Sequence, residues 1–268
     1  MTKRDMLLAA LWSQYAAINP QAAAIHALLT ARADRVVNDH LAFRTFRHPV
    51  VGLPRLAALL APLGYTARGE YHFPATHLYA QHFEAAAPTA PRLFVSELVT
   101  AECSPWLRET VAELLAQVAP AAVAQPSFLH AGRPWAPIGA ATWERLRQES
   151  EYAAWVAAFG YRANHFTVLV NALRSVDSLA ALVAVLQSAG FRLNETGGVI
   201  KGGPAEYLAQ AATLAAPTRV EFSDGVRELP GCYYEFAQRY PLPDGRLFSG
   251  FVAGSASKIF RSTDAGGR

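Results

Sequence analysis

The sequence predicts an α+β fold in which two βαβββ modules form a curled sheet around a metal site, with N-terminal and bridging helices. The two halves of the chain look like copies of one module. Each half opens a β-type run with histidine, continues into a helix that ends in Gly plus an aromatic residue, and reaches a β-rich run holding a carboxylate. The matching positions are His40 and His165, the segments 56–65 and 182–191, and Glu97 and Glu235.

The first half of the chain predicts two helices followed by one module. Apolar residues at helical spacing, interrupted at Asn19-Pro20, predict the two N-terminal helices. Pro54 and Gly64 suit the first turn and the C-terminal end of the helix of the module. The expected elements are helices within 5–32, a strand over 40–46, a helix over 54–63, and strands near 77–83 and 91–98.

The second half predicts a helical bridge and then the second module. Ser104-Pro105 suits the start of a helix, with serine as the cap and proline in the first turn. The expected elements are helices over 106–118 and 142–159, a strand from Asn164, a helix over 178–187, and strands over 219–223 and 231–236.

These elements predict a single domain over 1–268. Its parts are N-terminal helices over 1–37, a first module over 38–103, a helical bridge over 104–160, and a second module with a closing segment over 161–268.

Composition narrows the class of protein. The chain is 52% hydrophobic and 17% charged, as expected for a globular protein. A net charge of +3, scattered along the sequence, argues against a nucleic-acid partner. No apolar run is long enough to span a membrane, and the N-terminal apolar run is typical of an amphipathic helix, not of a signal peptide. The two cysteines have no metal-ligand spacing, so we expect a cytoplasmic protein with reduced thiols. The oligomeric state is not predicted.

Candidate metal ligands follow from the repeated pattern. Because side chains alternate along a strand, His40 and Arg44 are expected on one face, with only the small Ala42 between them. His165 and Glu235 complete a set of two imidazoles and one carboxylate. Such a set with open positions suits non-haem Fe(II) that binds a substrate and O₂ together, although zinc, manganese or nickel also fit it. The guanidinium fork of Arg44 suits a substrate carboxylate.

Other polar residues leave alternatives open. A lone histidine near a strand start is usually structural, but two at matching positions favour a metal site. Glu97 either completes a four-ligand site or is a neighbouring or structural carboxylate left over from duplication. His72, His77 and His82 do not keep to one strand face, so we interpret them as surface or loop residues.

Five segments carry a family resemblance: 38–44, 94–98, 164–167, 230–239, and 250–252 continuing through 259–263. Together they resemble the 2-oxoadipate dioxygenase/decarboxylase family, which is distantly similar to the vicinal-oxygen-chelate superfamily. The resemblance implies that His40, His165 and Glu235 bind Fe(II). It also implies that Arg44 holds a substrate carboxylate as the catalytic arginine, that His165 also contacts the substrate, and that Val252 lines the substrate pocket.

The implied reaction converts 2-oxoadipate and O₂ to 2-hydroxyglutarate and CO₂, within lysine catabolism. Members that act on 2-oxoadipate are longer than this chain, so a related 2-oxo acid stays open. Apolar walls are expected from Phe43, Phe166 and Phe236. Two other functions remain: a glyoxalase-type isomerase or lyase that uses Glu97 as a fourth ligand and needs no O₂, and a protein that sequesters a small ligand.

Overall fold

The N-terminal segment forms two helices, as predicted. The structure, a computed structural model, describes residues 1–87, 89–252 and 254. Helix α1 spans Lys3–Ile18 and α2 spans Pro20–Ala31. Thr2 and Asp5 cap the start of α1 reciprocally, each side chain accepting from the other backbone N–H. Asn19 separates the helices, and Pro20 takes the first position of α2, where its missing N–H costs nothing.

The first module has the predicted βαβββ order. Its elements are β1 (Asn38–Phe46), α3 (Leu53–Leu60), β2 (Tyr65–Phe73), β3 (Leu78–Ala85) and β4 (Arg92–Leu98). A 3-10 turn over Ala61–Leu63 extends α3, and Gly64 ends it in the left-handed conformation at φ +86°. The sequence did not locate β2, one of the three strands that this order requires after the helix, because its largely exposed, polar residues lack an apolar run.

The bridge contains three α-helices: α4 (Pro105–Leu115), α5 (Ala140–Glu149) and α6 (Glu151–Phe159). The predicted single helix over 142–159 was wrong, because Ser150 leaves the helical conformation between α5 and α6. Its hydroxyl accepts from the Ala153 N–H, so the same residue ends one helix and caps the next.

The second module repeats the order with one insertion. Its elements are β5 (Ala163–Leu169), α7 (Leu179–Ser188), β6 (Lys201–Gly203), β7 (Leu208–Ala212) and β10 (Tyr233–Arg239). Strands β8 (Pro217–Phe222) and β9 (Gly225–Pro230) form a separate hairpin beside α5, where the Ala140 N–H donates to Asp224. The prediction that residues 219–223 belong to the module's sheet was therefore wrong.

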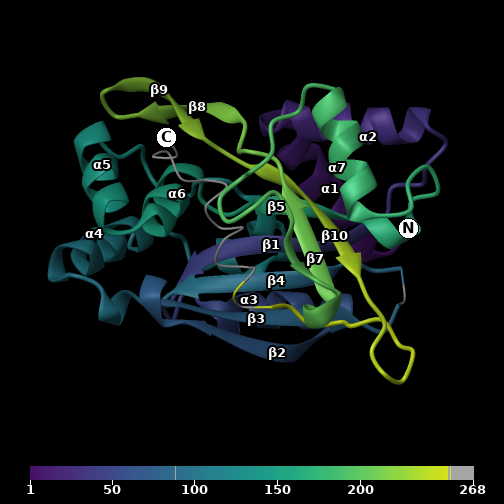
Figure 1. Cartoon of the computed structure of the whole chain (residues 1–268). Coiled ribbons are helices and arrows are strands. Elements are labelled where there is room, and N and C mark those ends of the chain that lie inside the picture. Colours follow the sequence, from purple (N-terminus) through teal and green to yellow (C-terminus); the bar gives the residue numbers. More distant parts are fainter. Residues whose placement is uncertain (88, 253, 255–268) are drawn as a thin grey trace.

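One eight-stranded sheet joins the two modules in the order β2-β3-β4-β1-β5-β10-β7-β6. Strands β1 and β5 pair antiparallel at its centre, and each pairs in parallel with the last strand of its own module, β4 or β10. The sheet curls strongly, as predicted for paired modules. Figure 1 shows α1, α2 and α7 beside the second half of the sheet, and α4 to α6 gathered at the opposite side.

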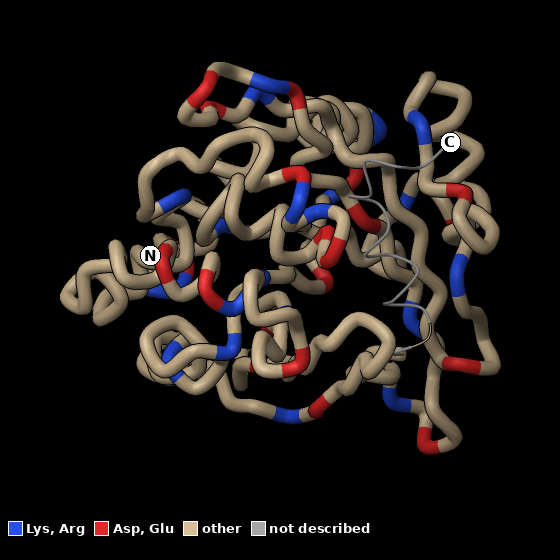
Figure 2. Tube along the Cα trace, turned by 90° about the vertical axis from the view of Figure 1, so that its left-hand side faces the viewer, with Lys and Arg blue, Asp and Glu red and all other residues tan. Residues whose placement is uncertain are grey.

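We propose that the two modules form a single domain, because one hydrophobic cluster draws buried residues from both of them and from α1, α2 and α6. Charged residues of both signs are interspersed along the chain (Figure 2). Within the described part of the chain, no helix is long and apolar enough to cross a membrane.

Candidate metal centre

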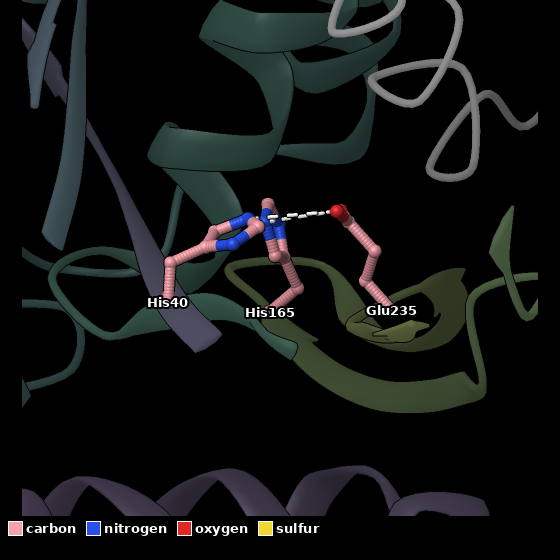
Figure 3. A group of neighbouring side chains, drawn as sticks. All are labelled: His40, His165 and Glu235. Atoms are coloured by element: carbon pink, nitrogen blue, oxygen red, sulfur yellow. Dashed lines mark ion pairs between the residues drawn. The ribbon is translucent and has the colours of Figure 1, made fainter. Parts of the chain in front are cut away.

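Three side chains from the two central strands and β10 converge: His40, His165 and Glu235 (Figure 3). One possible ligand atom from each lies within 4.8 Å of the others. The Nε2 atom of His40 is 3.5 Å from Glu235 Oε1, and the Nε2 atom of His165 is 3.4 Å from Glu235 Oε2. All three residues are at most 3% exposed. The structure thus brings together the three residues that the sequence selected.

Strand register explains the convergence. In the antiparallel pair β1–β5, His40 lies opposite Thr167 and Ala42 opposite His165, and in the parallel pair β5–β10, Thr167 lies opposite Glu235. Residues opposite each other share a face of the sheet, so all five positions face the same side. The Thr167 hydroxyl lies 3.1 Å from His40 Nε2.

A β-bulge precedes each histidine. Between β1 and β5 the register shifts at Asp39, and it shifts again at Asn164. Each extra residue bonds the histidine that follows it: Asp39 Oδ1 lies 2.8 Å from His40 Nδ1, and Asn164 Oδ1 lies 3.1 Å from His165 Nδ1. Both oxygens are acceptors and so favour a proton on Nδ1. In a neutral imidazole of that tautomer, Nε2 would offer its lone pair on the side of Glu235.

This donor set fits a cation. Three lone-pair donors converge in a buried space, and mutual repulsion between them is relieved by a metal ion. Burial raises the pKa of Glu235, opposed by His40 and by Gln210, whose Nε2 donates to Oε1 at 2.6 Å. Burial and the neighbouring His40 and Arg44 lower the pKa of His165 well below its usual value, so it is the neutral form that a metal requires.

Arg44 lies close to this centre. It is 4% exposed, and its guanidinium lies 5.1 Å from the Tyr152 ring and 5.0 Å from the Trp155 ring. After burial and His40, its charge is a further cause of the lowered pKa of His165. Four positions after His40, Arg44 lies on the same face of β1. Val252 is half-buried and directly follows Phe251, whose ring centroid is 4.7 Å from that of His40. The part of the family resemblance in 255–263 lies outside the described residues.

Glu97 is not a ligand of this centre. Register places Phe94, not Glu97, opposite Ala42, which makes Phe94 the structural counterpart of Glu235. Glu97 is three residues further along β4 and therefore points to the other face. There it accepts from the Leu53 N–H at 2.8 Å and from Arg47 Nε at 2.6 Å, at the wall of a separate cavity of about 700 Å³. The prediction that Glu97 matches Glu235 was wrong.

The predicted apolar walls also lie elsewhere. Phe166 neighbours His165 on the strand and so faces away from it, with its ring 5.1 Å from Trp12 and 4.9 Å from Tyr15 of α1. Phe236 likewise neighbours Glu235 and packs against the Tyr234 ring. Phe43 lies in the hydrophobic core. Strand alternation places these side chains in packing positions and not around the three converging residues.

The aromatic surroundings of the centre come from other residues. Phe251 contacts His40, Phe94, Tyr71 and His82 with ring centroids between 4.7 and 6.0 Å apart. His82 is 4% exposed and hydrogen-bonds to the Tyr71 hydroxyl at 2.8 Å, so interpreting it as a surface residue was wrong. The alternation of buried Leu78, Ala80 and His82 along β3 was the available signal. His72 and His77 are exposed.

Comparison with known proteins gives consistent matches. The sequence profile of the 2-oxoadipate dioxygenase/decarboxylase family matches residues 7–249. A chloroplastic 2-oxoadipate dioxygenase/decarboxylase from Arabidopsis thaliana is 34% identical over 257 residues, which are 84% of this chain and 67% of that protein.

Two crystal structures share the fold over most of their length. Hydroxyglutarate synthase from Oryza sativa, solved in complex with 2-oxoadipate, is 30% identical with a TM-score of 0.89, covering 97% of this chain and 91% of that one. A protein from Shewanella frigidimarina NCIMB 400, described as a hydrolase, is 44% identical with a TM-score of 0.90, covering 94% and 99%.

Proposed function

Because the chain belongs to the 2-oxoadipate dioxygenase/decarboxylase family, we propose that it is an Fe(II)-dependent dioxygenase that decarboxylates a 2-oxo acid. The observation that carries this proposal is the buried convergence of His40, His165 and Glu235. Two imidazoles and one carboxylate leave coordination positions for two reactants, the arrangement typical of non-haem iron oxygenases. Zinc, manganese and nickel accept similar donors, so the choice of iron rests on the family.

The proposed reaction takes 2-oxoadipate, or a related 2-oxo acid, and O₂ to CO₂ and a hydroxy acid one carbon shorter. For 2-oxoadipate that product is 2-hydroxyglutarate, and all atoms of both reactants are accounted for. The support is the rice relative, which was solved with 2-oxoadipate bound and whose chain is matched over 91% of its length. The insertions that distinguish longer relatives therefore need not be part of the catalytic core.

Each residue of the chain has a defined task in this proposal. His40, His165 and Glu235 would hold the metal, which supplies a Lewis acid and electrons for O₂. Arg44 would orient the substrate by a charge-assisted contact to a carboxylate. Val252 stays a predicted pocket residue, at the end of the segment that places Phe251 over His40.

Apolar rings border the proposed site beside His40. The rings of Phe251, Phe94 and Tyr71 lie within 6.0 Å of one another and form an apolar group beside His40. An apolar surrounding of this kind strengthens electrostatic contacts to a bound anion and limits side reactions with water.

The glyoxalase-type alternative loses its fourth ligand, because Glu97 caps α3 on the other face of the sheet. A sequestering protein has no need of three buried ligand atoms that converge. Lysine catabolism and a cytoplasmic location remain part of the proposal, and the plant relatives are named as plastid proteins.

The test is O₂ uptake after anaerobic loading with Fe(II), with a panel of 2-oxo acids that includes 2-oxoadipate. We expect uptake with equimolar release of CO₂ from at least one acid. His165→Ala should abolish iron binding and uptake together. If no acid supports uptake by iron-loaded protein, the dioxygenase proposal fails. Metal-dependent turnover of a substrate without O₂ would favour an isomerase or a hydrolase instead.

A further inference from the structure

Arg239 is a buried hub next to the candidate metal centre. It ends β10, four residues after Glu235, and is 2% exposed. It donates to both carboxylate oxygens of Asp39, from Nε at 2.6 Å and from Nη2 at 2.8 Å. It also donates from Nη1 to the backbone carbonyls of Phe248 and Gly250, at 2.8 and 2.9 Å. One guanidinium therefore joins two separate parts of the chain.

Both of those parts contact His40. Asp39 Oδ1 lies 2.8 Å from His40 Nδ1, and it is the same oxygen that accepts from Arg239 Nη2. The residues 248–251, which we name the closing segment, end in Phe251, whose ring meets the His40 ring edge-on at 4.7 Å. The Phe251 N–H donates to the Tyr71 hydroxyl at 3.1 Å, which fixes the far end of the segment.

The charges of Asp39 and Arg239 stabilise each other. Burial disfavours ionised Asp39, but Arg239 and His40 outweigh it and hold the pKa of Asp39 well below its usual range. Asp39 likewise outweighs burial to raise the pKa of Arg239. Removing one partner of such a fully buried ion pair strongly destabilises the protein, because the other charge is left buried and uncompensated. Arg239 and Asp39 are therefore expected to move together.

Among the described residues, the second histidine, His165, has no matching ionic hub. His165 is oriented by Asn164, a neutral amide, in the matching β-bulge. Register makes Leu98 of β4 the counterpart of Arg239, since Phe94 is the counterpart of Glu235. The ionic hub therefore acts on one imidazole only, and it is the imidazole that the closing segment touches.

We propose that Arg239 is a positioning residue that couples the closing segment to the metal ligand His40 through Asp39. The inference rests on the proposed role of His40 as a ligand. Displacing the closing segment removes two of the acceptors of Arg239. The buried guanidinium then turns toward other acceptors and takes Asp39 with it, which changes the orientation and basicity of His40. By reciprocity, a metal ion bound at His40 stabilises the closing segment.

The test uses Co(II) as a spectroscopic probe of the metal centre. Its affinity is measured from the visible d–d absorption, and hydrogen exchange of a peptide covering 248–252 is measured with and without Co(II). In the unmodified protein, we expect Co(II) to slow this exchange. In Arg239→Lys, which lacks the fork, affinity should fall roughly 10- to 100-fold, the usual effect of losing a partner of a ligand, and the slowing should disappear.

Two further variants make the result decisive. Asp39→Asn is nearly isosteric and can still accept from His40, so it should keep more of the Co(II) affinity but lose the slowing. It also carries the test if Arg239→Lys does not fold, as judged by circular dichroism. Asn164→Ala is the matched control, because it disturbs the orientation of His165 without touching the closing segment. It should weaken Co(II) binding and retain the slowing.

Coupling is refuted if Co(II) still slows the exchange in both Arg239→Lys and Asp39→Asn, because Arg239 would then be merely structural. It is also refuted if both variants bind Co(II) as the unmodified protein does. If the unmodified protein binds no Co(II), the proposed metal centre fails, and the coupling fails with it.

Discussion

Replacing Glu97 by Gln separates the two carboxylates that look equivalent in the sequence. Glu97 accepts from the backbone N–H of Leu53, at the N-terminus of α3, and from Arg47, whose side chain is 47% exposed. Glutamine keeps an acceptor of the same shape but removes the charge. We therefore expect a loss of stability, with no effect on metal binding or turnover.

The expected magnitude follows from the contacts. Exchanging a charged for a neutral acceptor at the Leu53 N–H costs about 1 kcal/mol. The lost interaction with the helix dipole adds roughly 0.3–1 kcal/mol. The half-exposed ion pair with Arg47 contributes less than about 1 kcal/mol. A total of about 2 kcal/mol lowers Tm by roughly 4 °C in a chain of this size.

The assay pairs Glu97→Gln with Glu235→Gln, the same substitution in the other module. Thermal unfolding of the metal-free protein and Co(II) affinity are measured for both. Glu235→Gln should leave Tm unchanged or raise it, because burial already disfavours its charge, and it should weaken Co(II) binding more than 100-fold. If Glu97→Gln abolishes metal binding while Tm stays constant, the assignment of both carboxylates is wrong and the four-ligand alternative returns.

Three further predictions concern substrate binding, packing and pH. Arg44→Ala should spare Co(II) affinity and lower kcat/KM by roughly 10- to 100-fold, as for a lost charged hydrogen bond of about 1.5–3 kcal/mol; normal steady-state kinetics would remove its substrate role. Phe166→Ala should cost about 3–5 kcal/mol in chemical unfolding, because its ring packs on α1, and leave KM unchanged. Burial lowers the pKa of His82 to about 4, whereas a histidine in the unfolded chain has a pKa of about 6.5. The unfolded state therefore binds more protons between these values, so stability should fall as pH drops from about 6.5 to about 4; in His82→Gln this part of the pH dependence should vanish from urea titrations.

The duplicated pattern in the sequence was sufficient to predict the repeated βαβββ order and the two histidines, and the family resemblance selected Glu235 over Glu97. His40 and His165 stand at the same point of two similar segments, and Glu235 follows in the second. The spacing of apolar residues and the caps at Pro54 and Gly64 predicted α3 closely. These signals are local, since helix periodicity and caps depend on neighbouring residues alone.

The errors at the candidate centre that concern Glu97, Phe166 and Phe236 share one cause, which is strand register. Glu97 was matched to Glu235 by its place in a similar run, but pairing with β1 puts Phe94 at that point. Phe166 and Phe236 were assigned to the site because they neighbour ligands in sequence, and a neighbour on a strand faces the other way. Register is set by pairing between distant segments, so sequence proximity cannot supply it.

The sequence by itself determined the two-module architecture and the two histidines, because these leave repeated local marks, and its family resemblance singled out Glu235 and Arg44. Only the tertiary structure decided which carboxylate faces the centre, which aromatic rings surround it, and how Asp39 and Arg239 join His40 to the closing segment. The β-bulges at Asp39 and at Asn164 each place the extra residue against the imidazole of the histidine that follows it. A bulge is a property of two paired strands, and it has no counterpart in the spacing of either strand alone.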